Sequence, residues 1–533
     1  MSALTFNPLP QAYHYPHFLR LPHALKAAID GGENWLVTAV PHPKAMTTTN
    51  TTVARKEPTQ ELSALKAAPT QAADWVIHEF AQAALPDERL QRRLELMASA
   101  FAQKPSAPIP EACANWAEAK GAYRFLENER VISGHIRRAH HQATLQRIKE
   151  HPVVLAIQDT TALNYSTHPQ TAGLGLLGSH SPKTIGLLLH STLAVTPQGQ
   201  PLGLMHSAVR VRRRGLAASR HKRKLAQKES FKWVESLQAC QELAPQCPQT
   251  RLVNVTDREG DLYELFVQAL SIPEHAQVHL LVRARHDRRL ADTDRTLWPE
   301  VARQRVAARL SVLVGRRGDQ PGRLARLNIR FSRVQLQPPT LLAGQPPIQL
   351  WAIQAEESTP TPKGVARIVW RLLTTLPVHS AAEAVEKVQW YAQRWQIEVL
   401  HKVLKSGCQI EQRQLETAQR LERVLSVDLV VAWRVLALCK AARQMPDDPI
   451  SNWLPQAQWQ ALWCYAQRQT TPPKTAPGVR QAVHWLAQIG GFLGRKSDGE
   501  PGPKTLWRGL CQLEAITDIW LLFHEKERSP KCG

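Results

Sequence analysis

The chain has 533 residues, which is long enough for two or more domains and a sizeable hydrophobic core. Its 67 Lys and Arg against 45 Asp and Glu give a net charge of +22, an excess that favours a polyanionic partner over a merely solvated basic surface. The eight cysteines include no C-x-x-C pair. Cys240 and Cys247, the closest two, have no histidine pattern nearby, so the spacing argues against a zinc site and for free cytoplasmic thiols.

The first part of the chain, residues 1–65, is rich in Pro, His and Thr and has little sustained periodicity. We therefore expect a mostly disordered extension there. It shows no charged segment followed by an apolar run, so we expect no secretion signal. Met46 is an internal candidate for the start of translation.

Residues 66–140 are predicted to form a helical domain. Residues 85–87 are typical of a turn before a helix, and Arg89, Arg92 and Arg93 give that helix a basic side. Such a side suits DNA phosphates, although an ordinary exposed helix face has the same pattern.

Two apolar runs of strand length, residues 153–158 and 252–256, are each followed by a carboxylate, Asp159 and Asp257. Taken singly, either acid is equally well explained as a helix cap or a turn residue. A mixed sheet that carries one acid at the end of its first strand and one on a later strand matches an RNase-H-like fold. We therefore predict an α/β, RNase-H-like domain over residues 141–440.

Residues 190–196 and 202–211 flank a Pro-Gln-Gly-Gln-Pro turn and predict a hairpin in this domain. A basic stretch follows, since residues 207–228 contain no acid. It predicts a loop or arm against DNA phosphates, with a solvated mobile loop as the alternative. Its basic residues are Arg210, Arg212, Arg213, Arg214, Arg220, Lys222, Arg223, Lys224 and Lys228.

Strand-like runs punctuated by Arg, Gly and Pro fill residues 277–375, which predicts a β-rich insertion. Its arginines either line DNA or decorate an exposed sheet face; they include Arg283, Arg285, Arg316 and Arg317. Trp370 lies in the last of these runs, where strand alternation alone would bury it in the core.

The helix predicted at residues 391–405 carries one carboxylate, a phenol and three cations on one face. These residues are Tyr391, Arg394, Glu398, Lys402 and Lys405. A carboxylate ringed by cations is a poor core stripe but suits phosphate together with a divalent metal ion.

The C-terminal part, residues 441–533, is predicted to be helical up to about residue 525. The apolar run at residues 429–439 is short and contains Arg434, which indicates a buried helix and not a membrane span. Residues 485–492 and 506–510 are rich in Trp and other apolar side chains, which either contact a second protomer or fill a small core.

Four of these stretches together resemble a known family. The pattern Tyr-x2-Arg-x3-Glu-x6-Lys that begins at Tyr391, with residues 121–128, 155–165 and 256–261, is similar to motifs of the insertion-sequence-four family of bacterial DDE transposases, which includes the transposon-five enzyme. The resemblance covers roughly residues 70–525.

The resemblance implies that Asp159, Asp257 and Glu398 are the catalytic and metal-binding acids. It also implies Mg²⁺ as cofactor, with Mn²⁺ as a substitute, because both are hard cations that prefer carboxylate oxygens. Two such ions about 4 Å apart suit in-line phosphoryl transfer. Asp261, a fourth acid nearby, is expected to cap or pair locally instead of binding metal.

The resemblance further assigns DNA contacts. Arg394 and Lys405 would clamp a phosphate at the DNA end, Tyr391 would donate a third hydrogen bond, and Trp370 would stack on a base flipped from that end. Lys183 lies in a loop similar to one near the DNA in the family. The alternative for the two cations is salt bridging to nearby glutamates, namely Glu398 and Glu411.

The function implied is that of a cut-and-paste transposase. It would bind inverted terminal repeats as a homodimer, cut the ends through a hairpin and join them to target DNA, in the bacterial cytoplasm at the nucleoid and without a membrane partner. Two other functions stay open: a catalytically silent end-binding inhibitor, and a metal-dependent nuclease without strand transfer.

Overall fold

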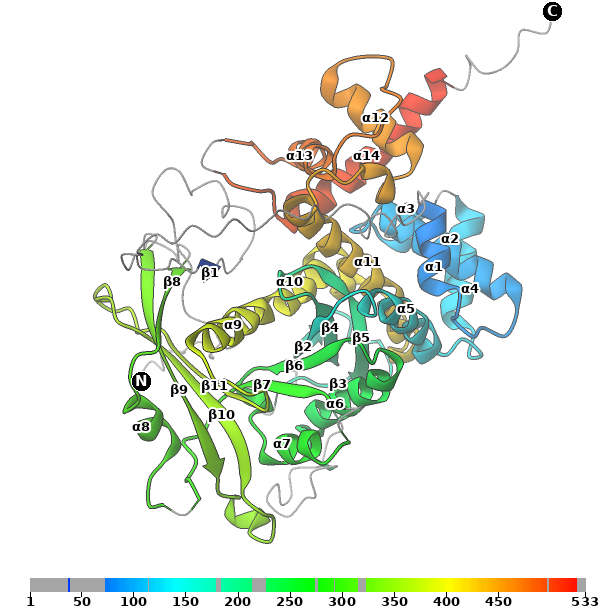
Figure 1. Ribbon diagram of the computed structural model, residues 1–533. Helices are drawn as coiled ribbons and strands as arrows, with labels where there is room; N and C mark the ends of the chain where they lie inside the picture. The colour runs from blue at the N-terminus through cyan, green and yellow to red at the C-terminus, as the bar shows by residue number, and fades with distance from the viewer. Residues whose placement is uncertain are drawn as a thin grey trace, which may run out of the picture.

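The computed structural model describes residues 37–38, 72–113, 115–178, 184–212, 227–273, 277–291, 293–314, 323–495 and 498–524. Figure 1 shows a long central sheet with a β-rich end and, at the other end, helices from both ends of the chain. The predicted fold class, an α/β RNase-H-like core with a β-rich insertion and helical flanks, is confirmed.

The described strands form one mixed sheet of eleven. Its order is β1-β8-β9-β10-β11-β7-β6-β2-β4-β3, and β5 also pairs with β4. The strands are β1 (Val37–Thr38), β2 (Val153–Asn164), β3 (Gly175–Leu176), β4 (Ile185–Val195), β5 (Pro201–Arg210), β6 (Arg251–Thr256), β7 (His279–Arg283), β8 (Ala308–Val314), β9 (Arg323–Leu336), β10 (Ile348–Glu357) and β11 (Val369–Thr374).

The core of the sheet is the run β5-β4-β2-β6-β7, in which β2 pairs parallel with β6, and β6 parallel with β7. The first three strands form antiparallel pairs, and the predicted β4–β5 hairpin is confirmed. Both faces of this core are covered, which explains the continuous apolar run at the start of β2. Val154 and Ala156 face one hydrophobic cluster, whereas Leu155 and Ile157 face the other.

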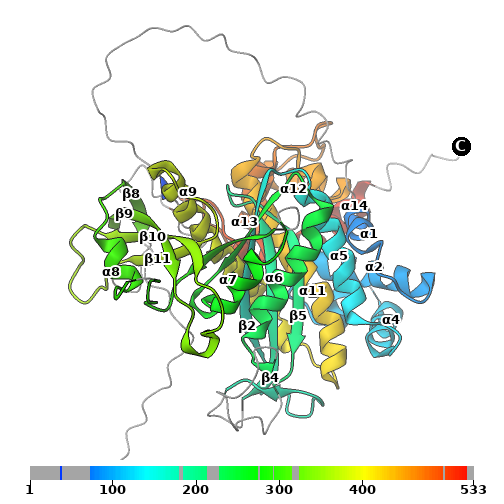
Figure 2. The ribbon, with the colours of Figure 1, turned by 60° about the horizontal axis from the view of Figure 1, so that its bottom comes forward.

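The helices that cover these faces come from different parts of the chain. Helices α6 (Phe231–Leu243) and α7 (Tyr263–Leu270) pack on the Val154 side, as Figure 2 shows. Helices α10 (Gln396–Lys402) and α11 (Ala418–Gln444) pack on the Leu155 side. The position of a residue along its strand therefore decides whether its side chain projects towards α6 and α7 or towards α10 and α11.

The β-rich insertion continues the same sheet. Strands β8, β9, β10 and β11 are antiparallel neighbours, and β11 joins them to β7. Strand β7, which lies in the range predicted for the insertion, pairs parallel with β6 of the core. Helix α8 (Leu297–Ala302) lies against β9 and β10, and α9 (Ala381–Ala392) against β8 and β9.

One strand of the expected extension is described. Val37 and Thr38 form β1, which pairs antiparallel with Val312 and Ser311 of the edge strand β8. The rest of the predicted disordered segment, Met46 included, lies outside the described residues.

Strand β2 is longer than predicted. We expected it to end at Asp159, but it runs to Asn164, because residues 159–164 keep pairing with β4 from Ser191 to Gly186. Asp159 therefore lies inside a strand, while Asp257 follows the end of β6 as predicted.

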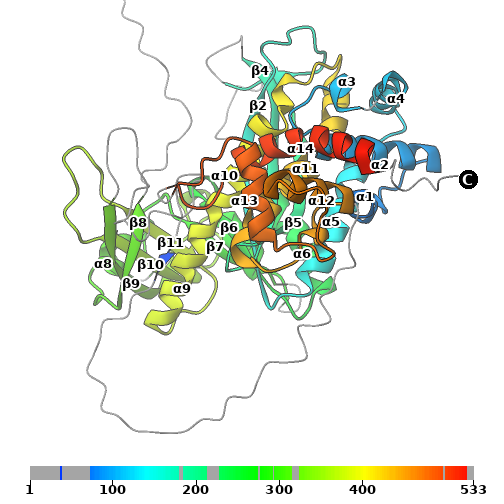
Figure 3. The same cartoon turned by 90° about the horizontal axis from the view of Figure 1, so that it is seen from above.

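The N-terminal helices are α1 (Ala72–Phe80), α2 (Glu88–Gln103), α3 (Ile109–Ala112), α4 (Trp116–Glu127) and α5 (Ser133–Ile148). The C-terminal helices are α12 (Gln456–Gln467), α13 (Val479–Ile489) and α14 (Pro503–His524). Both sets pack against α11, and Figure 3 shows α12 to α14 lying over it. Helix α11 thus contacts both helical regions and the sheet, and α5 of the N-terminal region also packs directly on β5.

The apolar stretch at residues 429–439 lies buried within α11, as predicted. In the part of the chain that the structure describes, none of the helices combines the length and apolar character that crossing a membrane requires. The seven described cysteines are free.

A buried charge cluster holds α1 to the rest of the protein. Glu79 accepts hydrogen bonds from His140 Nδ1 at 2.6 Å and from Arg147 Nη1 at 2.6 Å. His140 Nε2 in turn accepts the backbone N–H of Leu204, at 3.0 Å. Burial alone would raise the pKa of Glu79, but Arg147 and His140 outweigh it and hold that pKa well below its usual range. The cluster therefore ties α1 and α5 to β5.

We expect Glu79→Gln to destabilise the protein by about 2 kcal/mol at pH 7, since it removes a charged acceptor from a buried cluster. Because the pKa of Glu79 is depressed on folding, its contribution is present above the unfolded pKa of about 4.5 and is lost as the pH falls further. Melting temperatures of both chains between pH 7 and pH 3 should therefore converge below pH 4.5. Glu88→Gln, at an exposed position of α2, is the control. A gap that stays constant over this range would contradict the assignment.

Candidate active site

The two strand acids meet because β2 and β6 are parallel. Ile157 is paired with Val255, so Asp159 and Asp257, each two residues further on, lie level at the same end of the sheet. The side chain of Asp257 caps the short helix that follows by accepting the N–H of Glu259 at 2.8 Å. Asp159 accepts the N–H of Thr160 at 2.7 Å.

The third acid comes from the helical stretch that follows α9. The predicted single helix is divided: a 3₁₀ turn at residues 393–395 precedes α10, and a π-helical turn at residues 403–407 follows it. Glu398 lies in the first turn of α10, on the face directed at β2. Changes of helix type of this kind occur frequently at functional sites.

Arg394 joins two of the acids. Its Nη1 lies 3.1 Å from Asp159 Oδ2, and its Nη2 donates to Glu398 Oε1. The side chain of Arg394 is only 3% exposed. The structure therefore brings the predicted acids and the predicted phosphate ligand together, but with the arginine directed at the carboxylates. This is the salt bridge to Glu398 that the sequence left open.

Burial dominates the protonation of these acids. It raises the pKa of Asp159 to about 6 and that of Glu398 to about 7, although Arg394 pulls both down. The neighbouring carboxylates raise these pKa values further, Asp257 that of Asp159, and Asp159 and then Asp257 that of Glu398, as expected of carboxylates that lie close together. These acids are held in an environment that disfavours their charge unless a cation is present.

The chemistry of this donor set fits a hard divalent cation. Carboxylate oxygens are the ligands that Mg²⁺ and Mn²⁺ prefer, and a cation would relieve the repulsion among Asp159, Asp257 and Glu398. Among the residues that the structure describes, no three His, Cys, Asp or Glu side chains are grouped so as to hold a metal ion as they stand. Arg394 bridges two of the acids instead, so metal binding requires it to release at least one.

The predicted DNA ligands near the acids occupy different environments. Tyr391 is buried, and its ring lies 6.1 Å from that of Trp370, which is 5% exposed on β11. Lys405 is partly exposed, and its Nζ lies 3.8 Å from Glu411 Oε1. The core packing of Trp370 and the ion pair of Lys405 are the two alternatives that the sequence left open.

Asp261 pairs within the protein, as predicted. Its Oδ2 accepts the backbone N–H groups of Arg285 and His286 at 2.6 and 3.0 Å, and its Oδ1 lies 2.6 Å from Arg288 Nη1. It fixes the segment that follows β7.

The other predicted DNA-binding residues lie away from the acids. Arg89 and Arg92 are exposed on α2, in the N-terminal helices. Lys183 lies outside the described residues, as do Arg316, Arg317 and residues 213–226 of the basic stretch. Of that stretch, Arg210 pairs with Glu235 and Arg212 with Glu229.

Two residues at the site, Arg283 and His401, were not predicted from the sequence. Arg283, taken as a surface arginine of the insertion, is buried on β7 beside the phenol of Tyr391 and favours the charged form of that phenol, although burial raises the Tyr391 pKa overall. His401 on α10 is buried and bonded to Ser191 on β4. The available signal for both was a polar residue that directly follows apolar residues, Leu280–Val282 before Arg283, and Val399 and Leu400 before His401.

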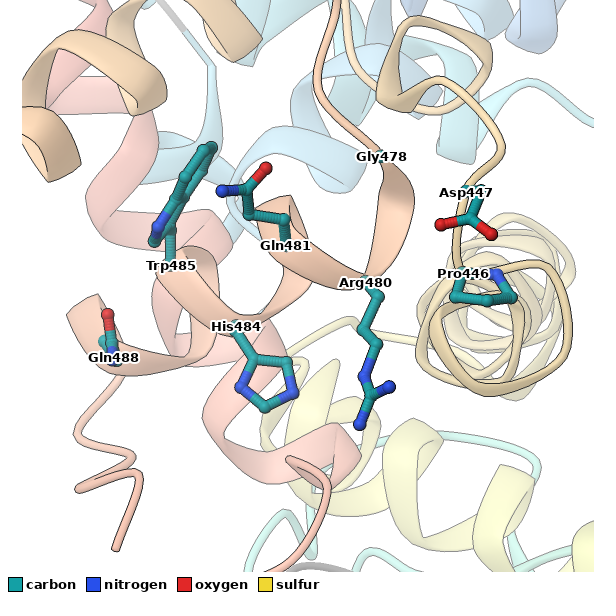
Figure 4. A pocket seen from close by; sticks show the side chains of 8 residues that line it. All are labelled: Pro446, Asp447, Gly478, Arg480, Gln481, His484, Trp485 and Gln488. Atoms are coloured by element: carbon teal, nitrogen blue, oxygen red, sulfur yellow. The ribbon is translucent and has the colours of Figure 1, made fainter.

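A separate cavity of about 620 Å³ lies in the C-terminal helices and is drawn in Figure 4. Side chains of α13, among them Arg480, His484 and Trp485, line it together with Pro446 and Asp447. Glu500 pairs with Arg480 and His484. This cavity includes none of the three acids.

An RNase-H-like sheet that collects acids at one end, with helical regions on both flanks, defines a class of nucleic-acid-processing enzymes. Comparison with known families agrees with this class. The family described as "Transposase DNA-binding" matches residues 72–131, "Transposase DDE domain" matches residues 255–429, and "Transposase Tn5 dimerisation domain" matches residues 430–519.

The chain belongs to the Tn5-like DDE transposases. It is a DNA-binding protein that forms homodimers, and its DDE domain is that of a nucleic-acid-cleaving enzyme, a class that uses divalent metal ions. The DDE match includes Asp257 and Glu398, whereas Asp159 precedes it.

We expect Arg394→Gln to lower the free energy of unfolding of the metal-free protein by about 3 kcal/mol at pH 8, because it leaves two half-buried carboxylates without their cation. The loss should be much smaller at pH 5.5. There, acids with pKa values of about 6 and 7 are already largely protonated. Urea unfolding in EDTA at both pH values measures this, with the partly exposed Arg420→Gln as control. Equal losses at pH 8 and pH 5.5 would show that the arginine acts by packing alone.

Proposed function

We propose that this protein is a cut-and-paste transposase whose catalytic, metal-binding acids are Asp159, Asp257 and Glu398. The observation that carries the proposal is the convergence of these three acids at one end of the core sheet, with pKa values raised for Asp159 and Glu398. Carboxylates in such an environment suit Mg²⁺, with Mn²⁺ as a substitute.

The reaction would be the stepwise cleavage and joining of DNA strands at inverted terminal repeats. Asp159, Asp257 and Glu398 would hold divalent cations, whose chemistry would neutralise the acids, activate the attacking oxygen and stabilise the leaving oxygen of an in-line phosphoryl transfer. Arg394, once released from one carboxylate, would bind the end phosphate through its planar fork. Tyr391 and Lys405 would add a hydroxyl donor and a second positive charge.

The hairpin step is supported by the position of Trp370. Its ring lies beside Tyr391 at the end of α9, so an aromatic surface lies next to the turn that leads to Glu398 on α10. A hairpin bends the DNA end sharply, and a base flipped out of that bend would stack on Trp370 if the ring became accessible.

The flanking regions support end recognition and pairing. We propose that Arg89 and Arg92 on the exposed side of α2 contact the terminal repeat, and that Lys183 contacts DNA near the acids. Our proposed boundaries are 1–65 for the extension, 66–140 for the DNA-binding domain, 141–440 for the catalytic domain and 441–533 for the dimerisation region. We also propose that the protein acts at the bacterial nucleoid.

For the surface that pairs two protomers we propose the end of α14, beyond the two segments that the sequence suggested. Much of residues 485–492 and 506–510 is buried inside the protein, where Trp507 packs against Gly407 at the end of the π-helical turn. Ile519, Leu522 and Phe523, one helical turn apart on α14, are instead 57%, 66% and 70% exposed. We propose that this α14 stripe contacts the second protomer, because exposed apolar stripes of this kind mark interfaces.

Replacing any one of the three acids by its amide should abolish Mg²⁺-dependent cleavage while leaving DNA-end binding, because binding rests on distributed basic contacts. The variants are Asp159→Asn, Asp257→Asn and Glu398→Gln. Cleavage is measured on a supercoiled plasmid with and without the terminal repeats found in the DNA that flanks the coding sequence.

The same assay separates the competing functions. A silent end-binding inhibitor would bind the repeats without cutting them, and a plain nuclease would cut the plasmid equally well without repeats. A variant that cleaves as well as the unaltered protein would remove its residue from the triad.

Trp370→Ala should nick the DNA end normally but form hairpins poorly, since stacking offsets about 1–3 kcal/mol of the cost of flipping a base. An abasic residue at the flipped position should partly rescue the variant. Normal hairpin formation by a folded Trp370→Ala protein would refute the stacking role, and a collapsed melting transition would show that Trp370 serves the core.

Leu522→Asp with Phe523→Asp should leave single-end binding intact and prevent complexes that hold two ends, because two charges would be buried at the protomer contact. Gel-shift experiments with ends of two lengths distinguish the complexes. Leu493→Asp, at another exposed apolar residue of the same region, is the control. If the double variant still pairs ends, the contact lies elsewhere.

A further inference from the structure

The two faces of the sheet at Asp159 have separate sets of polar contacts. Asp159 on β2 is paired with Ser191 on β4, so both side chains project from the same face, towards α10. Their neighbours along each strand project from the opposite face, towards α6. These neighbours are Gln158, Thr160, His190 and Thr192.

The face towards α6 carries a buried hydrogen-bond chain. Gln158 Nε2 donates to Asn254 Oδ1 at 2.6 Å, so its Oε1 accepts from His190 Nε2 at 2.9 Å. The Nδ1 of that histidine then accepts the Thr160 hydroxyl at 2.8 Å. The residues on both sides of Asp159 are thereby bonded to a single histidine of β4, which fixes the backbone from which the acid projects.

On the face towards α10, a polar bridge joins β4 to α10, beside the Arg394–Asp159 contact. Ser191 Oγ lies 2.8 Å from His401 Nε2, and both side chains are buried. His401 is three residues after Glu398, so the two side chains are neighbours on one side of α10. Burial lowers the pKa of His401 to about 3, which leaves the imidazole neutral and the bond uncharged.

Regular helix geometry alone does not set where α10 lies. A 3₁₀ turn precedes it and a π-helical turn follows it, so neither neighbour continues its hydrogen-bond ladder in register. Packing against the sheet and α11 supplies much of the missing restraint, and two polar contacts with the sheet add to it. Arg394 contacts the sheet through Asp159 before the helix, and His401 contacts it through Ser191 near its end.

In our proposed reaction the contact through Arg394 changes, because the arginine leaves one carboxylate when metal and phosphate bind. The Ser191–His401 hydrogen bond itself joins neither an acid nor a proposed DNA ligand, so the release of Arg394 need not break it. It is therefore suited to hold Glu398 opposite Asp159 while the charges around both acids change.

From this geometry we infer that Ser191 and His401 are positioning residues of the acid site, and that their hydrogen bond holds α10 on the sheet. The inference rests on the proposed role of Asp159 and Glu398 in cleavage. Small displacements of reacting groups are costly in such sites, since a shift of about 1 Å can reduce a rate by about 100-fold.

Loss of a buried hydrogen bond with a purely structural role would lower the melting temperature without changing α10 or cleavage. The chain offers a matched control for this case. Thr192, the next residue on β4, hydrogen-bonds Ser236 of α6 on the opposite face, and both side chains are fully buried. Thr192→Val removes a bond of the same type, at the same depth and on the same strand, without touching α10.

The test compares the full-length chain with Ser191→Ala, His401→Leu, their combination, His401→Gln and Thr192→Val. Hydrogen exchange of peptides over residues 396–402 reports on α10 without any catalysis. We expect exchange there to accelerate at least tenfold in Ser191→Ala and His401→Leu, and no further in the double variant. His401→Gln, which can still reach the serine hydroxyl, should restore slow exchange, and Thr192→Val should leave it unchanged.

The functional readout is plasmid cleavage as a function of Mg²⁺ concentration. We expect Ser191→Ala and His401→Leu to need roughly tenfold more Mg²⁺ for half-maximal cleavage and to cleave about 10- to 100-fold more slowly at saturation. End binding should be unchanged. Thr192→Val should cleave normally despite a similar drop in melting temperature.

Exchange and cleavage in Ser191→Ala that match those of Thr192→Val would overturn the inference, as would additive effects in the double variant. Failure of the proposed function has a different signature. In that case the unaltered chain would not cleave, or its triad variants would, whereas exchange over residues 396–402 would still respond to Ser191→Ala.

Discussion

The constraint on which this structure depends is the grouping of carboxylates where water is scarce. Asp159 and Glu398 are brought within reach of one guanidinium group, and burial together with Asp257 raises both of their pKa values. Such a group is unfavourable without a cation. Arg394 supplies that cation in the metal-free protein, which explains why a residue expected to bind phosphate is buried between two acids.

The helical regions are fixed to this site through arginines. Arg413 forms a two-point ion pair with Asp428 of α11 and donates to the carbonyl of Ala107 at 2.9 Å. Arg423 of α11 donates to the carbonyls of Leu126 and Val131. The carbonyl of Leu126 lies in the last turn of α4, where carbonyls otherwise lack helical partners, and those of Ala107 and Val131 lie in loops. These bonds hold the N-terminal helices at a defined position. DNA held by α2 would thus meet the acids in a set geometry, as cleavage at one phosphate requires.

Local patterns were sufficient to predict most of the core. Apolar runs and turn residues located β2, β6 and the β4–β5 hairpin, and helical spacing placed Arg394 and Glu398 on one side. They did not predict that β2 continues past Asp159, because the residues after it are polar and only pairing with β4 keeps them extended. The Trp-rich segments were harder still. A helix-period apolar face shows that a side chain is covered, but not whether the same chain or a partner covers it.

The energetic character of the site bears on whether this copy is an enzyme or only a DNA-binding protein. Shielding a charged carboxylate from water lowers the free energy of unfolding, and a neutral side chain of the same size would remove that cost. A protein that only occupied DNA ends would gain nothing from three such acids, whereas a metal-dependent enzyme needs them. The chain also maintains the supporting contacts on both faces of the sheet, from Gln158 and His190 to Ser191 and His401. The acids lower the stability of the fold, yet the hydrogen bonds that position them are kept. This combination favours a catalytic role over silent DNA binding.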